Sequence, residues 1–126
     1  MLPKFFIVLS FVSLNAWAVT PAELLAGYTA QSGQPVNAAK GETFFKASHG
    51  QEWQCTSCHG KSPIEGGRHA STDKAIEPLA PTANAKRFTD GAKVEKWFRR
   101  NCKDVLAREC TAAEKADVLA WLISLR

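Results

Sequence analysis

Methionine is almost absent from this sequence of 126 residues, since Met1 is the only one. A chain that loses its first residues therefore has no thioether side chain to offer a metal. Internal repeats and low-complexity tracts are also missing, which excludes solenoid and fibrous architectures. The 16 basic residues exceed the 12 acidic ones only slightly. This mild excess is typical of a solvated surface, which at most steers an acidic partner, and not of a nucleic-acid-binding site.

Long apolar runs are confined to the N-terminus. Lys4 precedes an apolar run over residues 5–14, and Ala16-Trp17-Ala18 then forms an A-x-A cleavage site. The run is too short to span a bilayer as a mature helix, and no cysteine follows the cleavage site to carry a lipoprotein anchor. We therefore predict a cleaved signal peptide over residues 1–18, with a retained membrane anchor as the alternative. The mature chain, residues 19–126, is predicted to be a single periplasmic domain without a membrane span.

Helix-capping patterns divide the mature chain into helices and one long loop. Thr20 and Glu23 form a capping box with Pro21 at the first helical position, and Thr111 and Glu114 form a second box. These patterns predict an all-α domain. The predicted helices span residues 21–31, 38–48, 91–103 and 112–125, and the second and third are capped by Asn37 and by Thr89 or Asp90.

The five residues Cys55-Thr56-Ser57-Cys58-His59 read C-x-x-C-H, the attachment signal for a c-type haem. Two thiols at this spacing reach the two vinyl groups on one edge of the macrocycle, and the adjacent histidine then ligates the iron from one side. A redox dithiol would need a βαβ setting, which the flanking sequence lacks. A zinc site would need Cys102 and Cys110 as its second pair, but seven residues separate them, more than is usual. The motif therefore predicts one covalent haem c, with His59 as the proximal iron ligand.

Residues 60–90 show no helical or strand period, and glycine and proline are scattered through them. A loop of this length is unusual inside a compact domain. A haem accounts for it, because the loop can wrap the macrocycle and bury Ile76, Leu79 and Phe88 on the porphyrin.

The sixth iron ligand cannot be methionine, because Met1 leaves with the signal peptide. In the third predicted helix, Val94, Trp97, Phe98 and Asn101 recur at i, i+3, i+4 and i+7 and therefore share one face. An asparagine on an apolar face needs a polar partner, or it costs about a kcal/mol or more. A neighbouring carbonyl or the haem propionates could be the hydrogen-bond partner of this amide, but the haem iron is the more specific candidate.

Other side chains remain open as sixth ligands. His49 precedes the haem motif by only six residues, which makes the opposite face of the haem hard to reach. His69 lies in the long loop, where a lone histidine is most often solvated. A lysine is the third alternative.

Several motifs resemble those of the sphaeroides haem protein family, which consists of unusual class I cytochromes c with an asparagine distal ligand. The likeness covers nearly the whole mature chain, and its most specific part is Arg100-Asn101-Cys102. The other matching motifs are Leu25-Ala26-Gly27-Tyr28, Cys55-Thr56-Ser57-Cys58-His59-Gly60, Pro78-Leu79-Ala80-Pro81, Arg87-Phe88-Thr89-Asp90, Val94-Glu95-Lys96-Trp97 and Glu114-Lys115-Ala116-Asp117.

The resemblance implies a class I cytochrome c fold and a set of site residues. The family's iron-ligating asparagine corresponds to Asn101, and its disulfide corresponds to Cys102 and Cys110. The helix before the haem motif crosses the terminal helix in this fold, which brings Gly41 and Phe45 to the contact. By the same resemblance we expect the Pro78 carbonyl to accept a hydrogen bond from Nδ1 of His59. The predicted haem contacts are Pro78, Leu79, Phe88, Val94, Trp97 and Phe98.

The resemblance also implies a function. We expect an exported monohaem cytochrome that is high-spin, or readily becomes so, and binds oxygen or nitric oxide at its ferrous haem. Family members take electrons from a dihaem cytochrome c and a membrane cytochrome b, so the same partners are expected here. Redox catalysis on the bound gas is left open. The alternatives are a low-spin electron carrier, with His69 or a lysine as the sixth ligand, and a non-haem zinc or structural module.

Overall fold

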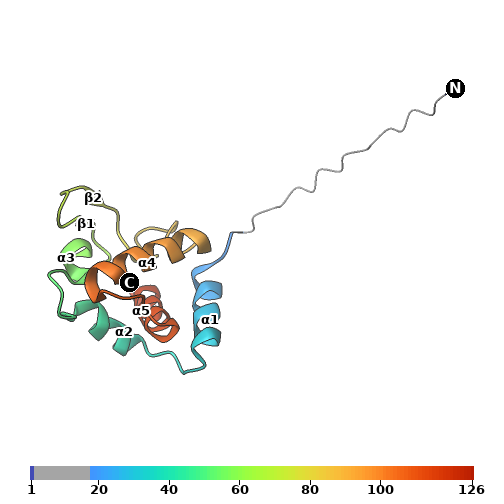
Figure 1. The fold of residues 1–126 in the computed structure, drawn as a ribbon, viewed down its shortest axis with the longest axis horizontal. Coiled ribbons are helices and arrows are strands. Elements are labelled where there is room, and N and C mark those ends of the chain that lie inside the picture. The colour runs from blue at the N-terminus through green and yellow to red at the C-terminus, as the bar shows by residue number, and fades with distance from the viewer. Residues whose placement is uncertain (2–17) are drawn as a thin grey trace.

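The computed structural model describes residue 1 and residues 18–126 (Figure 1). The predicted signal peptide therefore lies almost wholly outside the described residues, and its cleavage stays a prediction. None of the helices formed by residues 18–126 has the length and apolar character needed to cross a membrane.

Helices dominate the described part of the chain, as the capping patterns predicted. They surround the C-terminal helix, with one small hairpin at the edge (Figure 1). In chain order the elements are α1 (Pro21–Ser32), α2 (Ala38–Lys46), α3 (Cys55–His59), β1 (Gly67–Arg68), β2 (Ala75–Ile76), α4 (Gly91–Leu106) and α5 (Ala112–Ser124).

The predicted caps are present at the helix starts. Thr20 with Glu23, and Thr111 with Glu114, make both reciprocal bonds of a capping box, so each pair satisfies backbone groups at the first turn. The helix ends differ more from the prediction. Helix α2 ends at Lys46, two residues early, and α4 continues three residues beyond Lys103. Ala107 then stops α4 in the left-handed conformation with a φ of 56°.

Helices α2 and α5 approach each other closely where they cross. A Cβ atom at Gly41 would lie 1.9 Å from the carbonyl oxygen of Asp117, so only glycine allows the two backbones to touch. The Asp117 carboxylate also accepts a bond of 2.7 Å from the backbone N–H of Asn37. Beside this contact the rings of Phe45 and Trp121 lie 5.1 Å apart. The expected crossing of Gly41 and Phe45 with the terminal helix is confirmed.

The hydrophobic core lies around α5, whose buried face packs against α1 and α2. Phe88 and Val94 bring the long loop and α4 into the same core. Its buried members are Tyr28, Phe45, Phe88, Val94, Ala116, Val118, Leu119, Trp121 and Leu122.

The long loop is more ordered than its sequence suggested. Strands β1 and β2 pair antiparallel, with Gly67 opposite Ile76, where we had predicted no strand. Two-residue strands carry no hydrophobic period, which is why the pattern did not reveal them. Farther along, the carbonyl of the buried Pro63 accepts bonds of 3.0 Å from the backbone N–H groups of Leu79 and Ala80. The loop is therefore held by its own backbone.

Candidate functional site

The C-x-x-C-H motif forms its own short helix, α3. At its start the Ser57 hydroxyl accepts a bond of 3.0 Å from the backbone N–H of Gln54, and Gly60 ends it with a φ of 71°. Cys55 and Cys58 are half-buried free thiols placed about one helical turn apart, and the Cys58 sulfur accepts a bond of 3.3 Å from the Ala70 amide. Burial raises the pKa of the Cys55 thiol to about 11, so this thiol is protonated at neutral pH.

His59 ends α3 with its ring enclosed by protein. Its Nδ1 atom is buried and has no hydrogen-bond partner among the described residues. The ring lies 6.1 Å from that of Phe45. Burial, and then the positive charge of Arg87, lower the pKa of His59 to about 4. The imidazole is therefore neutral, which is the form that ligates iron.

A hairpin lies directly against the motif. A Cβ at Gly67 would come within 2.0 Å of the Cys58 carbonyl oxygen, so β1 rests on the backbone of α3. This cradle, the two free thiols and the neutral imidazole with an unpaired Nδ1 together fit a covalently bound haem. Cys55 and Cys58 would hold the porphyrin edge, and His59 would ligate the iron.

The expected bond from His59 to Pro78 is not present. The Pro78 carbonyl instead accepts a bond of 2.9 Å from Nε of Arg87, and the neighbouring Glu77 carbonyl accepts one of 2.8 Å from the same guanidinium. A charged guanidinium is the stronger donor, and it is half-buried here. Sequence reasoning missed Arg87, because nothing local indicates which carbonyls a loop arginine reaches.

Asn101 lies on α4 at the same helical face as Val94, Phe98 and Val105. Val94 and Val105 are buried, and Phe98 packs against the core. The Asn101 side chain is half-buried, and within residues 18–126 no protein group is hydrogen-bonded to its amide. The predicted alternative, an amide satisfied by a neighbouring carbonyl, is therefore not what the structure has.

The predicted haem contacts divide into two groups. Phe88, Val94, Phe98 and Leu79 pack in or against the protein core. Trp97, in contrast, is 43% exposed, although its spacing places it near Asn101. Their contacts with haem stay predictions.

The two histidines considered as alternative ligands both have partners. Nε2 of His49 lies 2.8 Å from the Phe44 carbonyl oxygen. Nδ1 of His69 lies 3.3 Å from the backbone nitrogens of both Ser71 and Thr72, which can only donate. Nδ1 of His69 is therefore the acceptor nitrogen, and the proton of the neutral ring sits on Nε2.

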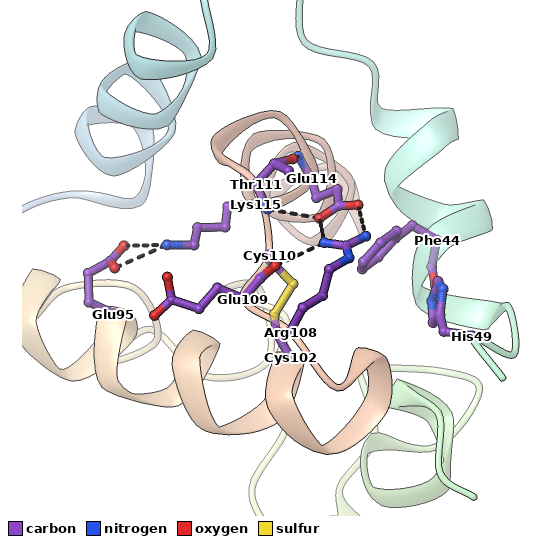
Figure 2. Close-up of a disulfide and its surroundings, with 10 residues drawn as sticks. All are labelled: Phe44, His49, Glu95, Cys102, Arg108, Glu109, Cys110, Thr111, Glu114 and Lys115. Atoms are coloured by element: carbon purple, nitrogen blue, oxygen red, sulfur yellow. Dashed lines mark hydrogen bonds and ion pairs between the residues drawn. A yellow bond between two sulfur atoms is a disulfide. The ribbon is translucent and has the colours of Figure 1, made fainter. Parts of the chain in front are cut away.

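Helix α4 is tied to the rest of the domain at two places (Figure 2). At its C-terminal end, Cys102 and Cys110 are joined as a disulfide with Cα atoms 5.6 Å apart, as the chain turns back after Leu106. The two cysteines are thus paired with each other, not with Cys55 and Cys58 as a zinc site would require.

The second tie is a polar cluster on the first half of α4, which we call the Glu95 clasp. The Glu95 carboxylate accepts bonds from the Tyr28 hydroxyl at 2.5 Å and from Nζ of Lys115 at 3.1 Å, so it joins α4 to α1 and α5. The Tyr28 and Phe98 rings meet edge to face at 5.8 Å. Burial would raise the pKa of Glu95, but the bonds from Tyr28 and Lys115 lower it below its ordinary value.

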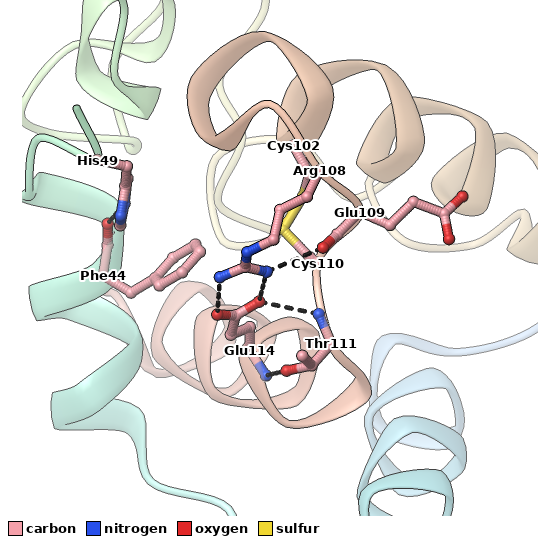
Figure 3. A network of polar contacts seen from close by, with 8 residues as sticks. All are labelled: Phe44, His49, Cys102, Arg108, Glu109, Cys110, Thr111 and Glu114. Carbon is pink, nitrogen blue, oxygen red and sulfur yellow. Dashed lines mark hydrogen bonds and ion pairs between the residues drawn. A yellow bond between two sulfur atoms is a disulfide. The ribbon is translucent and has the colours of Figure 1, made fainter. Parts of the chain in front are cut away.

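A similar cluster lies beyond the end of α4 (Figure 3). Both terminal nitrogens of Arg108 donate to the Glu114 carboxylate, at 2.8 and 2.9 Å, and Glu114 also caps α5 with Thr111. The bonds from Arg108 lower the pKa of Glu114. This cluster braces the connection between α4 and α5.

Comparison with known proteins places the chain in a family. Residues 31–122 match the family described as a domain of unknown function, DUF1924. The cytochrome c-type protein SHP of Cereibacter sphaeroides is 44% identical over 124 residues, which cover 93% of this chain and 95% of SHP.

Two solved structures are similar in fold. Oxidised SHP, described as an oxygen-binding cytochrome c, superimposes with a TM-score of 0.81 and 46% identity, over 86% of this chain and 99% of SHP. The solution structure of cytochrome c'' from Methylophilus methylotrophus, described as giving insight into haem-ligand detachment, has a TM-score of 0.72 and 36% identity, over 83% and 93% of the two chains. The chain therefore belongs to the DUF1924 family and to the SHP-type, mainly helical monohaem cytochromes, which carry one covalent haem c with its iron.

Proposed function

We propose that this protein is an exported cytochrome whose ferrous haem binds a diatomic gas, oxygen or nitric oxide, and whose ferric haem is ligated by Asn101. The Asn101 amide carries the proposal, because it lies on the same face of α4 as the buried Val94 and Val105 and is hydrogen-bonded to no protein group within residues 18–126. The description of the similar protein SHP as an oxygen-binding cytochrome c supports the gas-binding part.

The chemistry of an amide explains how such a site would open. A haem supplies an iron that binds gases and changes oxidation state by one electron. The Asn101 oxygen is a hard, weak donor, which suits ferric better than ferrous iron. Asn101 would therefore be the ligand of ferric iron and would be easily displaced from ferrous iron, so that a gas would not compete with a strong ligand. The similar cytochrome c'' is described in terms of haem-ligand detachment, which supports a displaceable ligand at this position.

His69 is the weaker candidate for the sixth position. Ligation through Nε2 would place the ring proton on Nδ1, which would break both contacts with the donating amides of Ser71 and Thr72. The Trp53 ring, whose centroid lies 6.2 Å from that of His69 in a T-shaped arrangement, also favours the present orientation of His69.

Visible spectroscopy of the purified holoprotein tests the proposal. Asn101→Ala is expected to stay haem-loaded, to change the ferric spectrum and to bind carbon monoxide at least as fast as the wild type. Asn101→His is expected to give a low-spin haem that binds gas much more slowly. His69→Ala is the matched control and should change neither property. If His69→Ala alters both while Asn101→Ala alters neither, His69 is the ligand and the protein is a plain electron carrier.

The electron donor belongs to the same proposal. We expect electrons to come from a dihaem cytochrome c, and a membrane cytochrome b is the second candidate. Both are reached in the periplasm, where the predicted signal peptide would deliver the chain and where an oxidising environment favours the Cys102–Cys110 bond. Rapid mixing of the ferric protein with a reduced dihaem cytochrome c measures this step directly.

A further inference from the structure

The positive charge of the mature chain is concentrated on one helix. Residues 19–126 contain 15 basic and 12 acidic side chains. Helix α4 alone holds five of the basic and two of the acidic ones, which leaves ten of each on the rest of the chain. The whole net excess therefore belongs to sixteen residues.

Four of the five cations of α4 lie on one exposed face, where Asp104 is the one acidic neighbour. Lys93, Lys96, Arg100 and Lys103 recur at i, i+3, i+7 and i+10, and all four are exposed. We call these four residues the basic face. None of them is in an ion pair within residues 18–126, whereas Arg99 and Glu95 do have partners. Their charges therefore act outward, on the surroundings of the molecule.

The basic face borders the side of α4 that carries the proposed iron ligand. Asn101 directly follows Arg100, and the ring of Trp97, one turn earlier, lies 5.1 Å from the Arg100 guanidinium. At about 100° per residue, Trp97 stands between the basic face and Asn101, which shares its own face with the buried Val94 and Val105. A partner on the basic face would thus approach beside the redox centre.

We propose that the basic face is the docking surface for an acidic electron-transfer protein, an inference that rests on the proposed function of Asn101. Charge complementarity argues for this occupant, since four unpaired cations raise the encounter rate with an anionic partner. Electron-transfer encounters are small and transient, and they need steering more than buried apolar area. An anionic membrane fits less well, because interfacial helices insert an apolar face, whereas Val94 and Val105 of α4 are buried.

The test measures the reduction of the ferric holoprotein by reduced flavodoxin, an acidic protein probe, at increasing ionic strength. The wild-type rate is expected to fall about tenfold or more as salt screens the basic face. Lys96→Gln/Lys103→Gln should lose most of this salt dependence. Lys40→Gln/Lys74→Gln is the matched control, because it removes the same charge from exposed positions outside α4 and should keep the wild-type dependence.

Three outcomes would overturn the docking surface. Equal losses in the two variants would mean that only net charge matters. If Lys96→Gln/Lys103→Gln changed the haem spectrum but kept the salt dependence of the rate, these lysines would act on the haem and not on a docking partner. The face would be assigned to a membrane if two results were found together. The wild type would sediment with phosphatidylglycerol vesicles in a salt-sensitive manner, and its rate of reduction by flavodoxin would not depend on salt. Because the Asn101→Ala spectrum is recorded separately, a failure of the proposed ligand is distinguishable from each of these.

Discussion

The segment that carries Cys55, Cys58 and His59 and the helix that carries Asn101 are held in place by different means. Gly67 brings the hairpin backbone onto the Cys58 carbonyl, and Phe45 of α2 lies against the His59 ring. Helix α4 approaches its neighbours through side chains, the Glu95 clasp and a disulfide. Backbone contact leaves no room for movement, whereas side-chain ties allow a helix to shift without unfolding. The difference suits the proposed roles of His59 as a permanent iron ligand and of Asn101 as a removable one.

The largest effect is expected at the attachment motif. Cys55→Ala/Cys58→Ala should remove the covalent haem, since no other free cysteine is present among the described residues. The wild-type holoprotein should have the mass of residues 19–126 plus one haem, and the double variant should lose that haem on acid extraction. A wild-type mass without haem, in a host that matures c-type cytochromes, would contradict the assignment.

The next effect concerns the backbone contact of α2 with α5. In Gly41→Ala the new Cβ would meet the Asp117 carbonyl, so the helices must separate. The free energy of unfolding should therefore fall by about 3 kcal/mol or more. Gly27→Ala is the control, because a Cβ at this helical position meets no atom within 4 Å. The control should be neutral or stabilised by up to about 1 kcal/mol. Denaturant titration measures the stability of both variants. Equal stabilities would mean that the backbone contact at Gly41 is not what holds α2 against α5.

The disulfide comes third. Closing its small loop stabilises the fold by about 2.5 kcal/mol in the chain-entropy model. Cys102→Ser/Cys110→Ser should lose roughly this amount, and it should also free the end of α4 next to Asn101. Carbon monoxide binding to the ferrous protein is therefore expected to change along with stability. Two titratable thiols in the native, air-exposed wild type would show that the bond does not form.

The Glu95 clasp should have the smallest effect on stability. Glu95→Gln should cost about 1 kcal/mol or less, because Glu95 is 42% exposed and water screens its pair with Lys115. Glu114→Gln, in the cluster of Figure 3, is the matched control. Both variants should lose some stability, but only Glu95→Gln should alter the rate at which gas enters the haem. Equal gas-binding rates in the two variants would mean that the clasp has no part in placing α4.

The pH dependence of the clasp has a defined sign. The pKa of Glu95 is lower in the folded protein than its ordinary value. The stabilisation it provides is therefore present above about pH 4.3, the unfolded pKa, and is lost as the pH falls through the folded pKa. The stability difference between the wild type and Glu95→Gln should accordingly shrink in acid, which denaturant titrations at pH 7 and pH 3 measure.

The sequence predicted those features of the fold that depend on residues close together in the chain. Thr20 with Glu23, and Thr111 with Glu114, mark helix starts because capping involves residues three apart. The end of α4 was missed, since Ala107 adopts a left-handed conformation without the glycine that usually signals one.

The site was predicted unevenly for a related reason. The attachment motif is contiguous, so its two thiols and its histidine could be identified from the sequence. The bonds from Arg87 to two loop carbonyls, and the clasp that joins Tyr28 to Glu95, connect residues that are 9 to 67 positions apart. Contacts of this kind depend on the folded arrangement of several elements, and one sequence carries no pattern that reveals them.

The touching backbones of α2 and α5 have a consequence for amide hydrogen exchange. Because Gly41 lies against the Asp117 carbonyl, the amides around this crossing cannot reach solvent unless both helices separate. Their protection should report the global free energy of unfolding. The amides of α4, which meets its neighbours through side chains, should exchange through smaller local openings. If the amides of α4 exchange before those of α2 and α5, α4 is the part of the molecule that can open locally while the haem stays bound.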